Sequence, residues 1–119
     1  MQQWSSLGLR AIDAEGDLMP KGYAIFTEKV NDQGAMGAYA QAAIPTIYAA
    51  GGTVIVGGPP ADVIEGEWHG DQTVIVEFAS VEAARSWYNS PEYQAVISQR
   101  HAAAESNAVI IGGFEVPAS

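Results

Sequence analysis

The most regular pattern of apolar and polar positions lies in residues 73–100, which read TVIVEFASVEAARSWYNSPEYQAVISQR. The first six of these residues are β-branched or aromatic apart from one glutamate, which predicts a strand. Ser80 then occupies an N-cap position, and the apolar residues that follow recur at helical spacing: Val81, Ala84, Trp87 and Tyr88. Ser90 and Pro91 predict a break and the start of a further helix. One face of that helix carries Tyr93, Val96, Ile97, Arg100 and Ala104.

Ahead of this stretch, the pattern predicts a strand, a helix and a second strand. The first strand covers residues 21–30, and the helix extends from an Asn-Asp turn to about residue 50. Pro45 lies inside the helical pattern, so a kink or a break is expected there. The second strand covers residues 53–56, and residues 62–70 are expected to resume it as the arm of a hairpin.

The element order that results predicts an α+β fold. Ser106 and Asn107 are expected to end the last helix, and residues 108–116 to form the final strand. The order β-α-β-β-α-β is typical of the ferredoxin-like arrangement, a four-stranded antiparallel sheet with both helices on one face. The second helix is broken near Ser90-Pro91.

The predicted strands are apolar on both faces, which bears on assembly. In the first strand, Tyr23 and Ile25 alternate with Ala24 and Phe26, so neither face is polar. An antiparallel sheet with one face in water normally alternates apolar with polar residues. Two helices cover only one face, so the other face requires a second cover. A second copy of the chain is the simplest, because a two-fold homodimer buries the same patch against itself.

Length, charge and cysteine content narrow the functional classes. A chain of 119 residues predicts one domain, here residues 20–119, with residues 1–19 as an N-terminal extension or arm. The formal charge of −9 disfavours binding to nucleic acid or to anionic membrane surfaces. The chain has no cysteine, and no apolar run approaches the length of a membrane span. With no signal-peptide pattern at the start, a cytoplasmic location is expected.

Three segments carry a resemblance to a known family: GYAIF, AAGGTVIVGGPPADVIEGEW and the stretch TVIVEFASVEAARSWYNSPEYQAVISQR. Together they resemble the domain of unknown function 1330 family over about residues 21–116. The resemblance implies a dimeric α/β-barrel, in which the sheet of one ferredoxin-like protomer packs on the sheet of its partner. It implies little about activity, since the wider superfamily includes cofactor-free monooxygenases, isomerases and ligand-sensing domains.

Arg100 is the leading candidate for a functional residue. Its guanidinium stays charged, so on an apolar helical face it requires an anionic partner. One interpretation pairs it with Glu77, which stands in the middle of an apolar strand. The other places Arg100 in a pocket between sheet and helices, where it binds a carboxylate, an enolate or a phenolate.

Aromatic residues and the two histidines complete the candidate set. Six aromatic side chains either form the wall of a pocket for a flat ligand or belong to the core: Tyr23, Tyr39, Trp68, Trp87, Tyr88 and Tyr93. His69 and His101 are candidate general bases, with Glu67 and Glu105 on the same strand face and helical face, respectively. Neither pair amounts to a metal site, so no metal and no cofactor is expected.

Two hypotheses remain from the sequence. In the first, a small homodimer binds a flat anionic or phenolic molecule, with Arg100 as anchor and Tyr23, Trp68 and Trp87 as walls, and is a candidate for cofactor-free proton transfer or oxygenation. In the second, the protein is a non-catalytic dimerisation or ligand-sensing module whose polar residues are structural.

Overall fold

The computed structural model describes residues 19–114 of the chain. Within them the elements are, in order, β1 (Gly22–Val30), α2 (Gln33–Ala49), β2 (Thr53–Gly57), β3 (Gln72–Phe78), α3 (Val81–Tyr88), α4 (Pro91–Gln94), α5 (Ile97–Ala103) and β4 (Ala104–Gly112). The expected N-terminal arm lies outside the described residues, apart from Met19.

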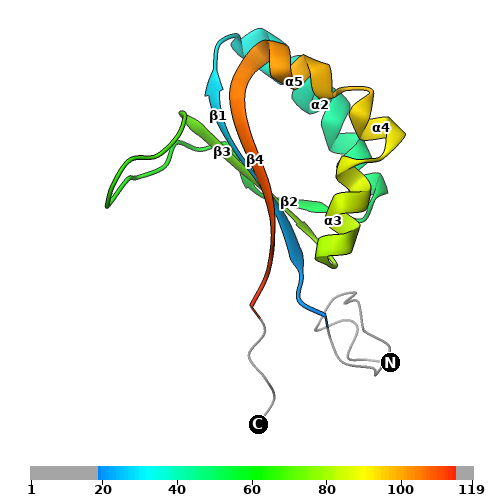
Figure 1. Cartoon of the computed structure of the whole chain (residues 1–119). Helices are drawn as coiled ribbons and strands as arrows, with labels where there is room; N and C mark the ends of the chain where they lie inside the picture. The colour runs from blue at the N-terminus through cyan, green and yellow to red at the C-terminus, as the bar shows by residue number, and fades with distance from the viewer. Residues whose placement is uncertain (1–18, 115–119) are drawn as a thin grey trace.

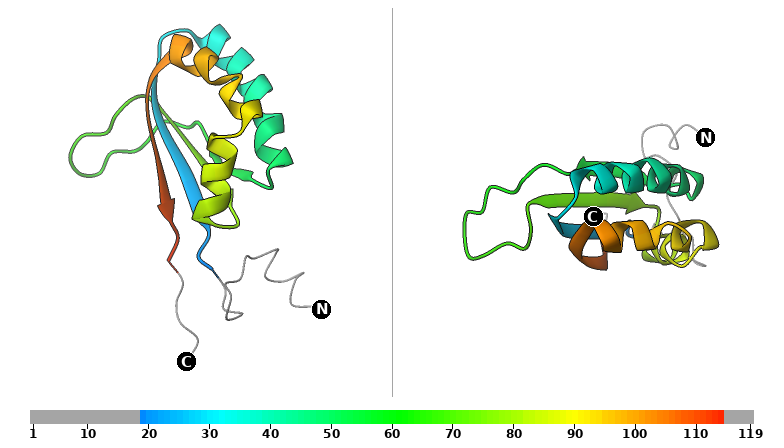
Figure 2. Two further views of the ribbon diagram at one scale, coloured as in Figure 1. Left: turned by 45° about the vertical axis from the view of Figure 1, so that its right-hand side comes forward. Right: turned by 90° about the horizontal axis from the view of Figure 1, so that it is seen from above.

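The four strands form one antiparallel sheet in the order β2-β3-β1-β4. The helices of the described residues lie together on one face of this sheet (Figures 1 and 2). The predicted α+β, ferredoxin-like arrangement is therefore confirmed. The caps are confirmed too, because the side chains of Ser80 and Ser90 accept hydrogen bonds from the backbone N–H groups of Ala83 and Tyr93.

Side chains of β1 alternate between the two faces of the sheet. Gly22, Ala24, Phe26 and Glu28 are buried and point toward the helices, on what we call the inner face. Tyr23, Ile25 and Thr27 point to the opposite side, the outer face. The inner face packs on an aromatic cluster in which the rings of Trp87 and Tyr93 lie 4.2 Å apart between centroids.

The outer face is apolar, as the sequence predicts. Ile25 lies between Ile75 and Val109 in the strand register, and Tyr23 lies beside Ile111. Val109 and Ile111 are each about half exposed, at 52% and 49%. Within residues 19–114, no helix covers this face.

Three details of the predicted elements differ from the structure. The helix α2 extends from Gln33 to Ala49 without a break at Pro45. Because this part of the helix is exposed, water can donate to the Gln41 carbonyl, which loses its helical partner to the missing N–H of Pro45. Residues 58–71 form a loop that projects from the sheet rather than a hairpin arm (Figure 1).

The third correction concerns the last helix, which ends at Ala103, three residues before the expected Ser106-Asn107 end. The carbonyl of Ala103 accepts hydrogen bonds from the N–H groups of Asn31 and Asp32, at 2.8 and 3.2 Å. Ala104 then pairs with Val30 in the sheet. Strand pairing thus replaces the helix that the alanine-rich sequence favours. His101 and Glu105 were expected on one helical face, and this prediction is wrong because Glu105 lies in β4.

Candidate functional site

A cavity of about 280 Å³ lies between α2 and the inner face of the sheet. Most of its wall is apolar and comes from five elements, with Phe26 on β1, Ile47 on α2, Val54 on β2, Val76 on β3 and Trp87 on α3. Its polar groups come from Glu28, Gln33, Tyr39 and Gln72. An apolar cavity with a few polar groups is the usual form of a small-molecule site. We call it the inner cavity.

Glu28 reaches the inner cavity because of the alternation along β1. It follows Ala24 and Phe26 at steps of two, so its side chain points to the same buried face, and it is only 2% exposed. In the sheet register Glu28 lies between Gln72 on β3 and Ser106 on β4, so three polar residues form a row across the inner face. The side-chain amide of Gln72 donates to Glu28 Oε1 at 2.7 Å.

The surroundings of Glu28 favour its protonated form. Burial raises the pKa of the Glu28 carboxyl above its ordinary value, and this effect outweighs the hydrogen bond from Gln72 and the charge of Arg100, which both lower the pKa. The neighbouring Ser106 Oγ is buried and has no hydrogen-bond partner among residues 19–114. This end of the inner face therefore retains unused hydrogen-bonding capacity.

A chain of hydrogen bonds leads from Arg100 toward the inner cavity. Arg100 Nε donates to the hydroxyl of Tyr93 at 3.2 Å, and the hydroxyls of Tyr93 and Tyr39 lie 2.6 Å apart. Burial, together with Tyr93, raises the pKa of Tyr39, so its hydroxyl stays protonated. Of the three, Tyr39 lines the inner cavity. Its hydroxyl is thus the end of a chain that starts at a buried cation.

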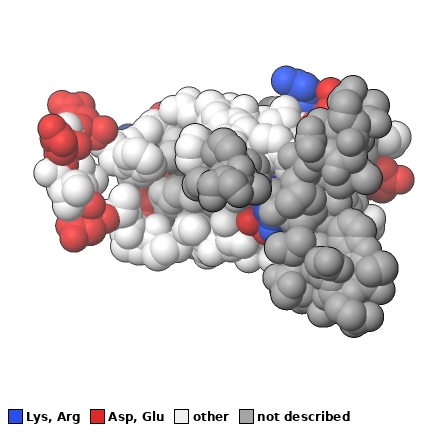
Figure 3. Space-filling model, turned by 90° about the horizontal axis from the view of Figure 1, so that it is seen from below, with Lys and Arg blue, Asp and Glu red and all other residues white. Residues whose placement is uncertain are grey.

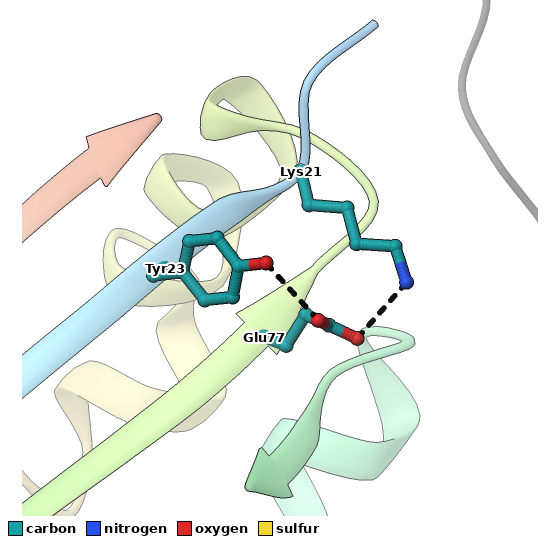
Figure 4. Close-up of polar contacts among 3 residues, drawn as sticks. All are labelled: Lys21, Tyr23 and Glu77. Atoms are coloured by element: carbon teal, nitrogen blue, oxygen red, sulfur yellow. Dashed lines mark hydrogen bonds and ion pairs between the residues drawn. The ribbon is translucent and has the colours of Figure 1, made fainter. Parts of the chain in front are cut away.

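The expected pair of Arg100 with Glu77 is wrong. Glu77 lies on the outer face, because it alternates with the buried Val76 and Phe78, whereas Arg100 lies on the helix side of the sheet. Glu77 instead accepts from Lys21 Nζ at 3.1 Å and from the Tyr23 hydroxyl at 3.2 Å (Figure 4). Among residues 19–114, no carboxylate lies within ion-pair distance of Arg100.

The alternative position of Arg100, in the wall of a pocket, is not observed either. Arg100 is 3% exposed and does not line the inner cavity. Its guanidinium carbon lies 5.0 Å from the centroid of the Phe26 ring, which supplies a cation–π contact in place of a carboxylate.

The other residues that the sequence singled out are dispersed. Trp87 belongs both to the core and to the wall of the inner cavity. Tyr23, Trp68 and His69 are associated with the outer face: Trp68 Nε1 donates to Thr73 Oγ1 at 3.1 Å, and His69 Nδ1 lies 2.9 Å from Thr27 Oγ1. His101 is exposed on α5.

Sequence reasoning missed Glu28 and Gln72. The available signal was the two-residue period of β1, which puts a carboxyl on the face of Ala24 and Phe26. Tyr39 and Tyr93 were recognised as aromatic candidates, but the contact between their hydroxyls joins residues 54 positions apart and has no local signature.

Acidic residues are also present in the loop that projects from the sheet. Those of the loop 58–71 include Asp62, Glu65 and Glu67, and acidic side chains gather at the projecting end of the molecule in Figure 3. Within residues 19–114, no three His, Asp or Glu side chains are grouped so as to hold a metal ion. None of the helices in that range has the length and apolar character that crossing a membrane requires.

Comparisons with known proteins extend this description. A family model described as "Domain of unknown function (DUF1330)" matches residues 21–114. Among curated proteins, no sequence matches this chain.

Solved structures with a similar fold include a protein of unknown function from Rhodopseudomonas palustris, with 20% identity, a TM-score of 0.67, and coverage of 82% of this chain and 85% of that one. SnoaB, a cofactor-independent oxygenase from Streptomyces nogalater, has 9% identity, a TM-score of 0.59, and coverage of 82% and 96%. A dimeric ferredoxin-like protein of unknown function from Jannaschia sp. has 13% identity, a TM-score of 0.56, and coverage of 76% and 97%. At these identities the likeness establishes the fold alone.

The position of Arg100 predicts which carboxylate is coupled to it. In urea titrations, Arg100→Met and Glu28→Gln should be non-additive, with a coupling of roughly 0.5–3 kcal/mol, because the two charges share one buried environment. Arg100→Met and Glu77→Gln should add within about 0.5 kcal/mol, since the two side chains lie on opposite faces of the sheet. Rescue of Arg100→Met by Glu77→Gln would contradict the structure.

The raised pKa of Glu28 predicts a direction for the pH dependence of stability. Below its ordinary pKa of 4.5 the carboxyl is protonated in both the folded and the unfolded states. As the pH rises above 4.5, the unfolded state ionises first, so the stability contributed by Glu28 falls until the pH passes the folded-state pKa. The unfolding free energy of the wild type minus that of Glu28→Gln should therefore decrease between these two pKa values. An increase over the same range would mean that the pKa of Glu28 is lowered by folding.

Proposed function

This chain belongs to the domain of unknown function 1330 family, and on that premise we propose that it binds a small, flat molecule in the inner cavity and transfers a proton on it without a cofactor. The observation that carries the proposal is a carboxyl group, Glu28, with a pKa raised by burial in the wall of an apolar cavity. Strongly perturbed ionisable groups in such cavities are typical of general acid–base catalysis.

Glu28 and Tyr39 have complementary roles in this proposal. The ionised Glu28 takes a proton from the bound molecule, and the negative charge that develops moves to an oxygen of that molecule. The Tyr39 hydroxyl then donates a hydrogen bond to that oxygen and stabilises its negative charge. Either hydroxyl of the Tyr39–Tyr93 pair can be the donor, and in the proposed mechanism Tyr93 donates to Tyr39, which leaves the hydrogen of Tyr39 free for the ligand.

The proton balance closes within the bound molecule. Glu28 accepts a proton from one atom and returns it to another, so the net reaction is an isomerisation that needs neither an oxidant nor a reductant. Oxygenation would require molecular oxygen as a further reactant, and the fold similarity to SnoaB supports it only at the level of fold. A non-catalytic ligand-binding module would use the same cavity without the proton transfer.

Hydrogen exchange on an enolisable ketone tests the catalytic step. In deuterated buffer, the wild-type protein should accelerate the loss of the α-proton signals of 2-tetralone in proton NMR spectra. Glu28→Gln should reduce this acceleration by roughly 10²–10⁴-fold, because the amide cannot accept the proton. Tyr39→Phe should reduce it to a smaller extent.

Glu77→Gln is the matched control, since Glu77 lies on the outer face. This variant should accelerate the exchange of 2-tetralone as much as the wild type does. Equal rates for the wild type and Glu28→Gln would overturn the proposed chemistry. Saturable binding of the ketone with no exchange would favour the non-catalytic module.

We further propose that the protein is a homodimer in which the outer faces of two sheets pack together. Two observations support this arrangement: Val109 and Ile111 on the outer face are about half exposed, and the similar Jannaschia protein is dimeric. Tyr23, Lys21 and Glu77 would then lie at the interface rather than in water. A two-fold axis would bring each apolar patch onto its copy.

Light scattering should give a mass twice the 12.5 kDa of one chain. Val109→Lys should shift the protein toward the monomer, because a lysine in the middle of the apolar face must be desolvated on association. Tyr48→Lys, at a site on α2 that is equally exposed (53%), should leave the dimer intact. A wild-type protein that stays monomeric at micromolar concentration would rule out the interface.

A further inference from the structure

The charges around the inner cavity determine which ligands it accepts. Of the side chains that line the cavity, only Glu28 carries a formal charge when ionised at neutral pH, and that charge is negative. The cation of this region, Arg100, lies behind Tyr93 and Phe26 and does not reach the wall. A ligand in the inner cavity therefore meets a carboxyl group directly, and meets the positive charge only through Tyr39.

From this arrangement we propose that the inner cavity selects uncharged molecules that carry one weakly acidic hydroxyl group, a phenol or an enol, and excludes the corresponding carboxylates. The proposal rests on the function proposed above, because it identifies the ligand class of the same cavity. It reverses the expectation of an anion anchored by Arg100.

Exclusion of carboxylates follows from like charge in an apolar environment. A bound carboxylate would lie beside Glu28 with few polar groups to solvate either anion, so one of the two would have to take up a proton before binding. The apolar wall formed by Phe26, Ile47 and Trp87 cannot replace the lost water.

Cations are disfavoured for the complementary reason. The charge of Glu28 is already offset by the hydrogen bond from Gln72 and by the field of Arg100, as the opposing influences on its pKa indicate. A bound ammonium group would add a positive charge without a new anion to balance it.

A neutral hydroxyl group avoids both difficulties. It donates to Glu28, and when the proton moves, the O–H bond of the ligand breaks and the O–H bond of Glu28 forms. The negative charge then passes from Glu28 to the ligand oxygen, where Tyr39 is the donor, so the net charge of the buried region stays constant. The cavity volume of about 280 Å³ suits a molecule of one or two rings.

Three probes with the same ring system test the selection: 2-naphthol, 2-naphthoate and 2-naphthylmethylammonium. Titrated into the wild-type protein at neutral pH and followed by fluorescence, 2-naphthol should bind at least about tenfold more tightly than either ion. Glu28→Gln keeps the acceptor for Gln72 and removes the charge, so the protein should stay folded. In this variant the carboxylate should gain at least about tenfold in affinity, because the charge of Arg100 is no longer offset.

Gly37→Leu locates the binding. Gly37 lines the inner cavity, and a Cβ added there meets nothing within 4 Å, so this point of the wall has room for a larger residue. Binding of 2-naphthol should be lost in this variant; unchanged binding would place the ligand elsewhere and overturn the proposed cavity itself. If the wild type binds 2-naphthoate as tightly as 2-naphthol and Gly37→Leu abolishes both, the charge selection is wrong while the cavity stands. Absence of saturable 2-naphthol binding up to millimolar concentration also overturns the selection. The exchange experiment with 2-tetralone then tests separately whether the protein catalyses proton transfer.

Discussion

The interior of the domain is arranged around the free energy required to bury Glu28. A carboxylate that is 2% exposed in an apolar environment is strongly destabilised unless it is protonated, hydrogen-bonded or balanced by a cation. All three occur to some degree, because burial raises its pKa, Gln72 donates to it, and the charge of Arg100 acts on it. Without these contacts the polar end of the inner cavity would not be compatible with a folded core. Of the two residues that support Glu28, Gln72 also lines the inner cavity.

Arg100 balances Glu28 without forming an ion pair with it, and this separation has chemical consequences. A direct pair would hold the carboxylate permanently ionised and lower its pKa. Instead the guanidinium is held by the Tyr93 hydroxyl and by the face of the Phe26 ring. Burial therefore raises the pKa of the Glu28 carboxyl by more than the charge of Arg100 lowers it.

A single strand, β1, serves both the inner cavity and the surface on the other side of the sheet. Its residues Phe26 and Glu28 line the inner cavity. Its odd-numbered residues, with Lys21 and Glu77, form a polar and apolar surface on the outer face. In the dimer that we propose, each cavity would lie one sheet away from the interface.

The sequence alone determined the element order, the caps at Ser80 and Ser90, the break at Pro91 and the apolar character of both sheet faces, because each depends on residues close together in the chain. Only the tertiary structure decided where α5 ends, since strand pairing with Val30 outweighs the helical preference of the alanine-rich segment. It also decided the partners of Arg100 and Glu77, which share an apolar setting in sequence but lie on opposite faces of the sheet. The contact between Tyr39 and Tyr93 and the row from Gln72 through Glu28 to Ser106 join segments that are distant in the chain. No local pattern encodes such contacts, because they arise from the packing of helices on a sheet.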